Sequence, residues 1–169
     1  TDLEAYCLVA GIGNGELVDQ LLAQTRLRLV VVDPSAEKVA ALRDRCDKAG
    51  LYGTRLAAQA GELGTAELPV YFASVIVAGE PFRGDLGALY RSLRPYGGSA
   101  YLPTDQGVHQ LIAGIVEAGG LPEAKLKWES GITRITRAGA LAGSSNWTHE
   151  YGDAANSLTS SDELVKAPL

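Results

Sequence analysis

The sequence has few of the side chains that build metal centres or disulfides. Its 169 residues include no methionine, two cysteines and two histidines. His109 and His149 stand far apart in the chain, so no Cys/His cluster has metal-ligand spacing, and we predict no metal site. Cys7 and Cys46 fall within apolar patterns, and we interpret both as small core residues rather than as a disulfide pair.

The chain also lacks a basic excess and a long apolar run. Its formal net charge is −5 at pH 7, which argues against a nucleic acid or an anionic membrane as partner. No apolar run approaches the roughly 18 residues of a membrane-spanning helix. With 46% hydrophobic and 21% charged residues, the composition is that of a soluble globular protein, and the length suits one domain of ordinary size.

The first two thirds of the chain alternate strand-like and helix-like patterns. Apolar runs predict five strands buried on both faces, as in a parallel sheet, over residues 5–10, 28–33, 55–59, 73–78 and 99–103. Apolar residues at helical spacing lie between and after these runs. Such alternation with short connections predicts a doubly wound α/β sheet with right-handed crossovers.

A different pattern follows this alternation. Residues 124–139 contain two short strand patterns around Ser130-Gly131, which predicts a β-hairpin. After that the composition shifts to Gly, Ser, Asn, Thr and Asp, with few large apolar side chains. We therefore predict one domain over residues 1–138 and an extended polar arm or linker over residues 139–169.

A glycine-rich turn follows the first predicted strand. Gly11, Gly13 and Gly15 alternate there, and glycine permits positive φ and close approach of the backbone to a ligand. Asp33 ends the second strand about twenty residues later, where a carboxylate can accept both hydroxyls of a ribose. Together they indicate an adenosine-containing cofactor. The alternative is a merely tight turn, with Asp33 capping the next helix.

The spacing of the glycines argues against a dinucleotide. Dinucleotide-binding turns have the pattern G-x-G-x-x-G, with the third glycine inside the helix. Glu16 occupies that position in this chain, and an acid there would repel a pyrophosphate. A nicotinamide-dependent oxidoreductase is therefore disfavoured, and a cofactor without phosphate is favoured.

Residues 5–138 resemble the class I S-adenosylmethionine-dependent methyltransferase family. "CLVAGIGNG" is similar to its first motif, "VVDPS" to its ribose-binding segment, "QAGELG" to its adenine-flanking loop and "LRPYGG" to the turn before its fifth strand. The resemblance implies a Rossmann-like, mostly parallel sheet closed by a C-terminal antiparallel hairpin, with S-adenosylmethionine as cofactor. The cofactor-binding residues that it implies are Gly11, Ile12, Gly13, Gly15, Asp33, Pro34, Gly61, Glu62 and Ala78.

Some positions depart from the family pattern. Val9 stands where the family usually has an acid that holds the methionine moiety, and Gly61, beside Glu62, stands where an adenine-binding acid is usual. Glu80, after the fourth strand, is a candidate catalytic base, whereas we interpret His109 as a surface or core residue. Two functions stay open. One is cofactor binding with methyl transfer to an unidentified acceptor, and the other is a non-catalytic scaffold.

The polar arm carries a resemblance of its own. Trp147 and the stretch Asp153 to Ser157 resemble the opening strand of PQQ-binding-like (quinoprotein) β-propellers. This implies that residues 144–169 join a propeller or a partner subunit. With the missing methionine, it leads us to expect one module of a larger bacterial protein. We expect a cytoplasmic location if S-adenosylmethionine is used and an extracytoplasmic one if the chain is fused to such a propeller. An ordinary polar arm with a docking tryptophan is the alternative.

Overall fold

One sheet of seven strands organises the first part of the chain. The computed structural model describes residues 5–141, 143–145 and 162–164, and its contacts divide the chain into two units, Thr1–Ala138 and Gly139–Leu169. The strands of the first unit are β1 Tyr6–Ala10, β2 Arg28–Asp33, β3 Leu56–Ala60, β4 Ala73–Ala78, β5 Gly98–Pro103, β6 Ala124–Glu129 and β7 Ile132–Arg137. Its helices are α1 Glu16–Gln24, α2 Ala36–Lys48, α3 Leu86–Ser92 and α4 Gln106–Glu117.

The order of strands in the sheet is β3-β2-β1-β4-β5-β7-β6. The first five strands pair in parallel, and β7 pairs antiparallel with both β5 and β6. The direction of winding reverses between β1 and β4, which places a topological switch point there. This arrangement confirms the predicted doubly wound sheet closed by an antiparallel hairpin.

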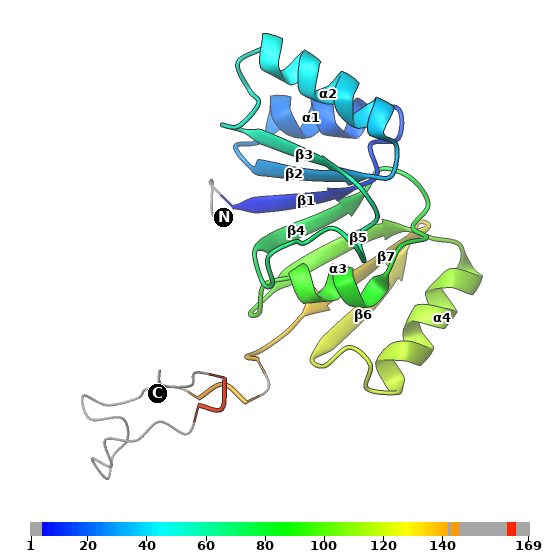
Figure 1. Cartoon of the computed structure of the whole chain (residues 1–169). Coiled ribbons are helices and arrows are strands. Elements are labelled where there is room, and N and C mark those ends of the chain that lie inside the picture. Colours follow the sequence, from blue (N-terminus) through cyan, green and yellow to red (C-terminus); the bar gives the residue numbers. More distant parts are fainter. Residues whose placement is uncertain (1–4, 142, 146–161, 165–169) are drawn as a thin grey trace. The chain divides into compact units, whose positions relative to one another are not determined.

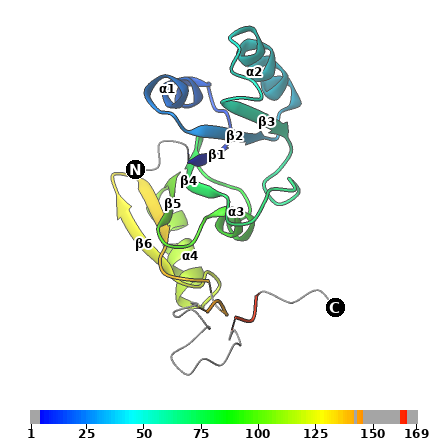
Figure 2. The same cartoon turned by 90° about the vertical axis from the view of Figure 1, so that its left-hand side faces the viewer.

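The helices fall into two groups. In Figure 1, α1 and α2 lie beside β2 and β3, whereas α3 and α4 lie beside the strands at the other end of the sheet. Figure 2 shows the same grouping after a quarter turn. Each group has its own core. One core surrounds Cys7, Val9 and Val18, and the other surrounds Leu8, Ile76 and Leu89, so both faces of β1 are buried.

Several local predictions are confirmed. The Ser35 side chain caps α2 by accepting from the backbone N–H of Lys38, and Gly50 lies just beyond the end of that helix with φ +68°. The hairpin turns at Ser130 and Gly131, with φ values of 52° and 75°. Positive φ at both central residues is the geometry that two-residue hairpin loops prefer.

Both cysteines are core residues. Cys7 and Cys46 are free and buried in the core that α1 and α2 cover. Burial raises the pKa of the Cys7 thiol to about 12. The interpretation of both cysteines as small core residues is therefore confirmed.

The described residues of the second unit fall in three short segments, 139–141, 143–145 and 162–164. Gly143 accepts a backbone hydrogen bond from Glu163 (2.8 Å), and the Asp162 carboxylate accepts from the N–H groups of Ser145 and Leu164. The propeller-like stretch from Trp147 to Ser157 lies outside the described residues. Among the described residues, no helix has the length and apolar character needed to cross a membrane.

Candidate functional site

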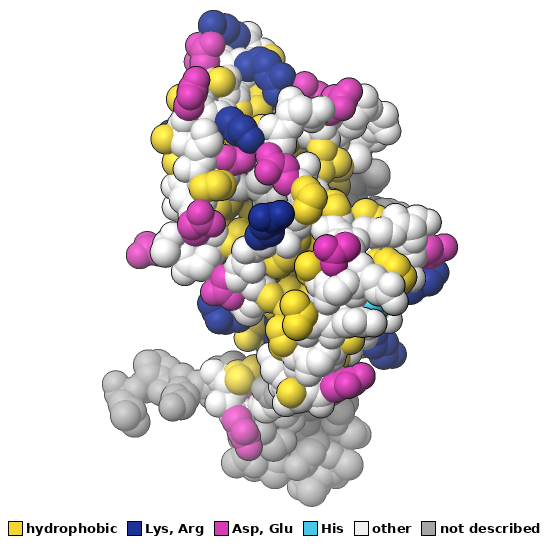
Figure 3. All heavy atoms as spheres, turned by 90° about the vertical axis from the view of Figure 1, so that its right-hand side faces the viewer, with side chains coloured by type: hydrophobic (Ala, Val, Ile, Leu, Met, Phe, Trp, Pro, Cys, Tyr) yellow, Lys and Arg dark blue, Asp and Glu magenta, His cyan; other side chains and the backbone are white. Residues whose placement is uncertain are grey.

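A cavity of about 300 Å³ opens at the carboxyl ends of β1, β2 and β4, beside the switch point. Ligands of doubly wound sheets bind at this place, and 300 Å³ is at the lower end of the range for small-molecule sites. The residues that line it are Ala10, Gly11, Val32, Pro34, Gly61, Glu62, Leu63, Glu80, Pro81, Phe82, Arg83 and Gly84. Figure 3, which looks towards this edge of the sheet, shows acidic, basic and apolar side chains interspersed rather than gathered by charge.

Three glycines connect the strand ends around the cavity. The N–H of Gly11 donates to Val32, that of Gly79 donates to Ala10, and that of Gly61 donates to Asp33, over 2.8–3.1 Å. Each bond extends the parallel ladder one step beyond the strands. The backbone that borders the cavity is therefore fixed by the protein's own hydrogen bonds.

Glycine is needed at different positions of the first turn for different physical reasons. Gly11 has φ +83°, and a Cβ built on it meets no atom within 4 Å, so only the backbone angle favours glycine there. A Cβ on Gly13 would lie 2.7 Å from the carbonyl oxygen of Gly79, and one on Gly79 would collide with the carbonyl oxygen of Gly11. The loops after β1 and β4 therefore touch through glycine, and at Gly13 the close neighbour is protein backbone.

Asp33 supports this loop from inside. Its side chain is 3% exposed, and its two carboxylate oxygens accept from the backbone N–H groups of Ile12 (2.7 Å) and Ser35 (2.8 Å). One carboxylate thus holds the glycine turn and the start of the next helix together. Ribose binding by Asp33 stays a prediction, and the structural role that we weighed against it is visible in these two bonds.

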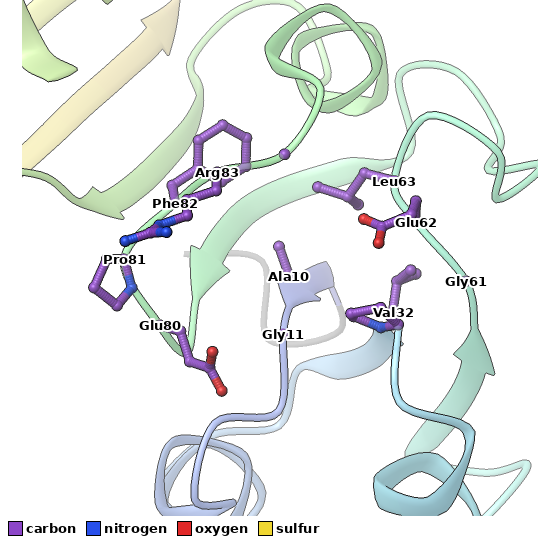
Figure 4. A pocket seen from close by; sticks show the side chains of 12 residues that line it. Ala10, Gly11, Val32, Gly61, Glu62, Leu63, Glu80, Pro81, Phe82 and Arg83 are labelled. Carbon is purple, nitrogen blue, oxygen red and sulfur yellow. The ribbon is translucent and has the colours of Figure 1, made fainter.

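Two other carboxylates border the cavity directly. Glu62 follows β3 and Glu80 follows β4, and Figure 4 shows them on opposite sides of the space beyond Gly11. The Glu80 carboxylate forms an ion pair of 3.1 Å with the ammonium of Lys38, in the first turn of α2. The hydrogen bond to Glu80 raises the pKa of Lys38. A site with these groups favours a ligand that carries hydroxyls or positive charge.

The predicted residues divide between two neighbouring hollows. The cavity brings together Gly11, Pro34, Gly61, Glu62 and Glu80. Ile12, Gly13 and Gly15 line a second hollow of about 240 Å³, with Asn14, Lys38, Ala41, Leu42 and Arg45. Asp33 and Ala78 are buried beneath the surface and line neither hollow.

Sequence reasoning missed part of the cavity wall. Leu63, Phe82 and Arg83 line it, and a Cβ on Gly84 would lie 3.2 Å from both Leu63 and Phe82. The backbone N–H of Phe82 donates to Pro103 at the end of β5 (3.2 Å), which fixes the segment after β4 against the sheet. Of these residues, Leu63 lies in the segment "QAGELG" that resembles an adenine-flanking loop, and the sequence signal for Phe82 and Arg83 is the segment "EPFRG" directly after a predicted strand.

His109 belongs to a separate cluster on the hairpin side. Its ring stacks on Trp128 at 5.6 Å, and its Nδ1 lies 3.0 Å from the hydroxyl of Thr133, which is fully buried. The residue joins α4 to β6 and β7 and does not line the cavity. In the part of the chain that the structure describes, no group of three His, Cys, Asp or Glu side chains could hold a metal ion.

Comparisons with models of protein families and with curated proteins find no match. Solved structures do match. A Methanococcus maripaludis protein provisionally assigned as an S-adenosyl-L-methionine-dependent methyltransferase is similar, with TM-score 0.65 and 15% identity over 81% of this chain and 78% of that one. The antibiotic-resistance methyltransferase Kmr is similar with TM-score 0.60 and 16% identity, over 82% of this chain and 89% of its own.

A third similar structure is a phosphoethanolamine N-methyltransferase of Haemonchus contortus in complex with S-adenosyl-L-methionine. Its TM-score is 0.59 at 15% identity, over 75% of this chain and 35% of the enzyme, so this chain spans about a third of that enzyme's length. At such identities the likeness shows the fold alone. The first unit of this chain has the Rossmann-like fold of the class I S-adenosylmethionine-dependent methyltransferases.

Proposed function

We propose that residues 5–138 form a domain that binds S-adenosylmethionine in the cavity beyond β1 and β4. The observation that carries the proposal is the position and lining of this cavity. It lies at the switch point of a sheet with the methyltransferase fold, and it is bordered by an open glycine, Gly11, and by the two carboxylates Glu62 and Glu80.

The residues present fit this cofactor chemically. The cofactor joins an adenosine to an amino acid through a sulfonium, so it offers ribose hydroxyls as donors and two positive charges. Carboxylates accept from such hydroxyls and attract such charges. Glu62 and Glu80 would supply these acceptors, Gly11 would give the backbone close access, and Leu63 and Phe82 would supply apolar contact to the base. When bound, the cofactor supplies an activated methyl group.

For transfer of that group, this chain offers mainly binding and orientation. Among the residues that line the cavity, the side chains that could serve as a base are those of Glu62 and Glu80. Glu80 is paired with Lys38, and its side chain is 55% exposed. This is a poor setting for a general base, so the observation favours a second candidate function, a cofactor-binding scaffold without turnover.

The scaffold function would need a partner. We propose that residues 144–169 contact a β-propeller domain or another subunit, on the basis of the propeller-like stretch that begins at Trp147. This proposal is independent of the cavity.

Calorimetric titration of the whole chain with S-adenosylhomocysteine, with NAD as the comparison ligand, tests cofactor binding. We expect binding in the micromolar range for the first ligand and none for the second. Glu62→Gln removes a cavity carboxylate, and Glu67→Gln removes an exposed one in the same loop outside the cavity. Affinity should fall about tenfold in the first variant and stay unchanged in the second.

Asp33→Ala is a poor variant for this purpose, because it would release the Ile12 and Ser35 backbone groups and so disturb the loop itself. Absence of heat with S-adenosylhomocysteine at ligand concentrations up to the millimolar range would overturn the proposed function. Binding that is equal in the wild type and in Glu62→Gln would move the site away from this cavity.

A further inference from the structure

The ion pair between Lys38 and Glu80 joins the start of helix α2 to the loop after β4, across the glycine turn. Lys38 Nζ lies 3.1 Å from Glu80 Oε1, although the residues are 42 positions apart. Lys38 comes from the start of α2, Glu80 follows β4, and the turn of Gly11 to Gly15 lies between these elements at the sheet edge. A Cβ on Gly13 would lie 3.5 Å from the Glu80 side chain, so the carboxylate is close to this turn.

The two charges border two adjoining hollows. Glu80 lines the cavity proposed for the cofactor, and Lys38 lines the hollow on the other side of the turn, together with Gly13 and Asn14. The other cation of that hollow, Arg45, is engaged by the Asp19 carboxylate at 2.8 Å and 3.0 Å. Lys38, in contrast, is paired with Glu80, and this ion pair links the second hollow to the cofactor cavity.

The pair is open to solvent and retains unused bonding capacity. The side chains of Lys38 and Glu80 are 45% and 55% exposed, and ion pairs of this kind contribute little to folding. An ammonium has three donors and a carboxylate has about four acceptor sites, whereas the contact between Lys38 and Glu80 uses one of each. Both side chains can therefore bind a further charged group without leaving each other.

The free end of an α-amino acid is complementary to this pair. It carries an ammonium and a carboxylate on one carbon, so its two charges lie side by side as those of Lys38 and Glu80 do. We infer that Glu80 receives the ammonium, and Lys38 the carboxylate, of the amino-acid end of the ligand whose adenosine occupies the cavity. This inference rests on the proposed function and makes Glu80 a binding residue rather than a base.

Val9, at the position where the family usually has an acid that holds the methionine moiety, cannot contact the ligand. It is 0% exposed and faces the core beneath α1 and α2, so it has no access to the cavity. Arg83 is the cation among the residues that line the cavity, on the same loop as Glu80. Arg83→Gln therefore serves as the matched control, because it removes one positive charge from the cavity and leaves the ion pair in place.

Two ligands separate the amino-acid end from the rest. S-adenosylhomocysteine and 5′-methylthioadenosine share the adenosine and the thioether, but only the first has an amino acid. Calorimetry on the whole chain should show at least about tenfold tighter binding of the first, the factor of one charge-assisted hydrogen bond. Lys38→Gln and Glu80→Gln should each lower this ratio towards one, with 5′-methylthioadenosine still bound. Arg83→Gln should keep the ratio.

A charge swap excludes a purely structural role. The double variant Lys38→Glu/Glu80→Lys retains an ion pair between α2 and the loop after β4 but presents each charge of the ligand with a like charge. We expect it to bind 5′-methylthioadenosine and to lose the preference for S-adenosylhomocysteine. Restoration of the preference in the double variant would overturn the inference.

The remaining outcomes separate the two proposals. Equal affinity of the wild type for both ligands, or a ratio that Lys38→Gln and Glu80→Gln leave unchanged, would overturn the recognition role while the cofactor site stands. Binding of neither ligand would overturn the proposed function, and the recognition role would fall with it.

Discussion

Asp33 and Glu80 are carboxylates at the same edge of the sheet, in very different surroundings. Asp33 is 3% exposed and holds two backbone N–H groups. Glu80 has a side chain that is 55% exposed and holds one lysine. The acid that the sequence pattern assigns to the ligand thus already holds two backbone groups of the protein, whereas the acid in the less distinctive segment is exposed beside the cavity.

This contrast defines two layers of the sheet edge. The inner layer consists of Asp33 and Gly79, which are packed or bonded against neighbouring strands. The outer layer consists of Lys38, Glu62 and Glu80, whose charged ends border the hollows. Substitutions in the inner layer should change stability, and those in the outer layer should change binding. The predictions below test that division.

Asp33→Ala should have the largest effect. It leaves the backbone N–H groups of Ile12 and Ser35 without their acceptor, and each unsatisfied group costs about 1–3 kcal/mol. We expect the free energy of unfolding in urea to fall by about 2–4 kcal/mol. Asp33→Asn retains one acceptor oxygen and should lose about half as much. If Asp33→Ala lowered the free energy of unfolding by less than about 1 kcal/mol, Asp33 would not have the structural role assigned to the inner layer.

Gly79→Ala should rank next. Its new Cβ would collide with the carbonyl oxygen of Gly11, and relief of that collision requires a backbone shift that costs about 2–3 kcal/mol. Gly11→Ala is the matched variant, because its Cβ meets nothing and only the positive φ opposes it, at about 1 kcal/mol. Denaturant midpoints measure both. Equal effects would mean that the two loops separate readily.

Cys7 should make stability depend on alkaline pH. Its pKa is about 12 in the folded chain and near 9 for an unburied thiol, so above pH 9 the unfolded chain releases a proton that the folded chain keeps. Stability from this group is complete below pH 9 and falls as pH rises towards 12, by at most about 1.4 kcal/mol per pH unit. The wild type should therefore lose stability faster than Cys7→Ala between pH 8.5 and 10, and parallel curves would contradict this.

Glu80→Gln and Lys38→Gln should have the smallest effect on stability. Their ion pair is exposed, so we expect both thermal midpoints to stay within experimental error of the wild type. Any change should instead be visible in ligand binding. A clear loss of stability in either variant would show that the outer layer also supports the fold.

Most of the fold was predictable from the sequence. The strand at residues 28–33 coincides with β2, and those at 5–10 and 73–78 coincide with β1 and β4 within a residue, because buried parallel strands form continuous apolar runs. The burial of side chains on helix α4 was less predictable than the helix itself. Its apolar spacing is regular, yet only Ile112 is buried and Leu111 is 70% exposed, since no neighbour covers that side of the helix within the described residues.

The candidate site was predictable only in part. Gly11, Gly61 and Glu62 follow predicted strands at the carboxyl edge, and they do line the cavity. The Lys38–Glu80 pair and the wall at Phe82 could not be predicted, because they depend on how the segment after β4 lies against the glycine turn and β5. No local pattern encodes a contact across 42 positions.

The sequence by itself determined which segments are strands and helices, where the hairpin turns and where glycine is needed, because these follow from local periodicity and backbone sterics. Only the tertiary structure decided what each acid at the sheet edge does. Burial between strand ends commits Asp33 to two backbone donors, and exposure beside α2 pairs Glu80 with Lys38. The role of a carboxylate depends on the donors and solvent around it, and the fold arranges both.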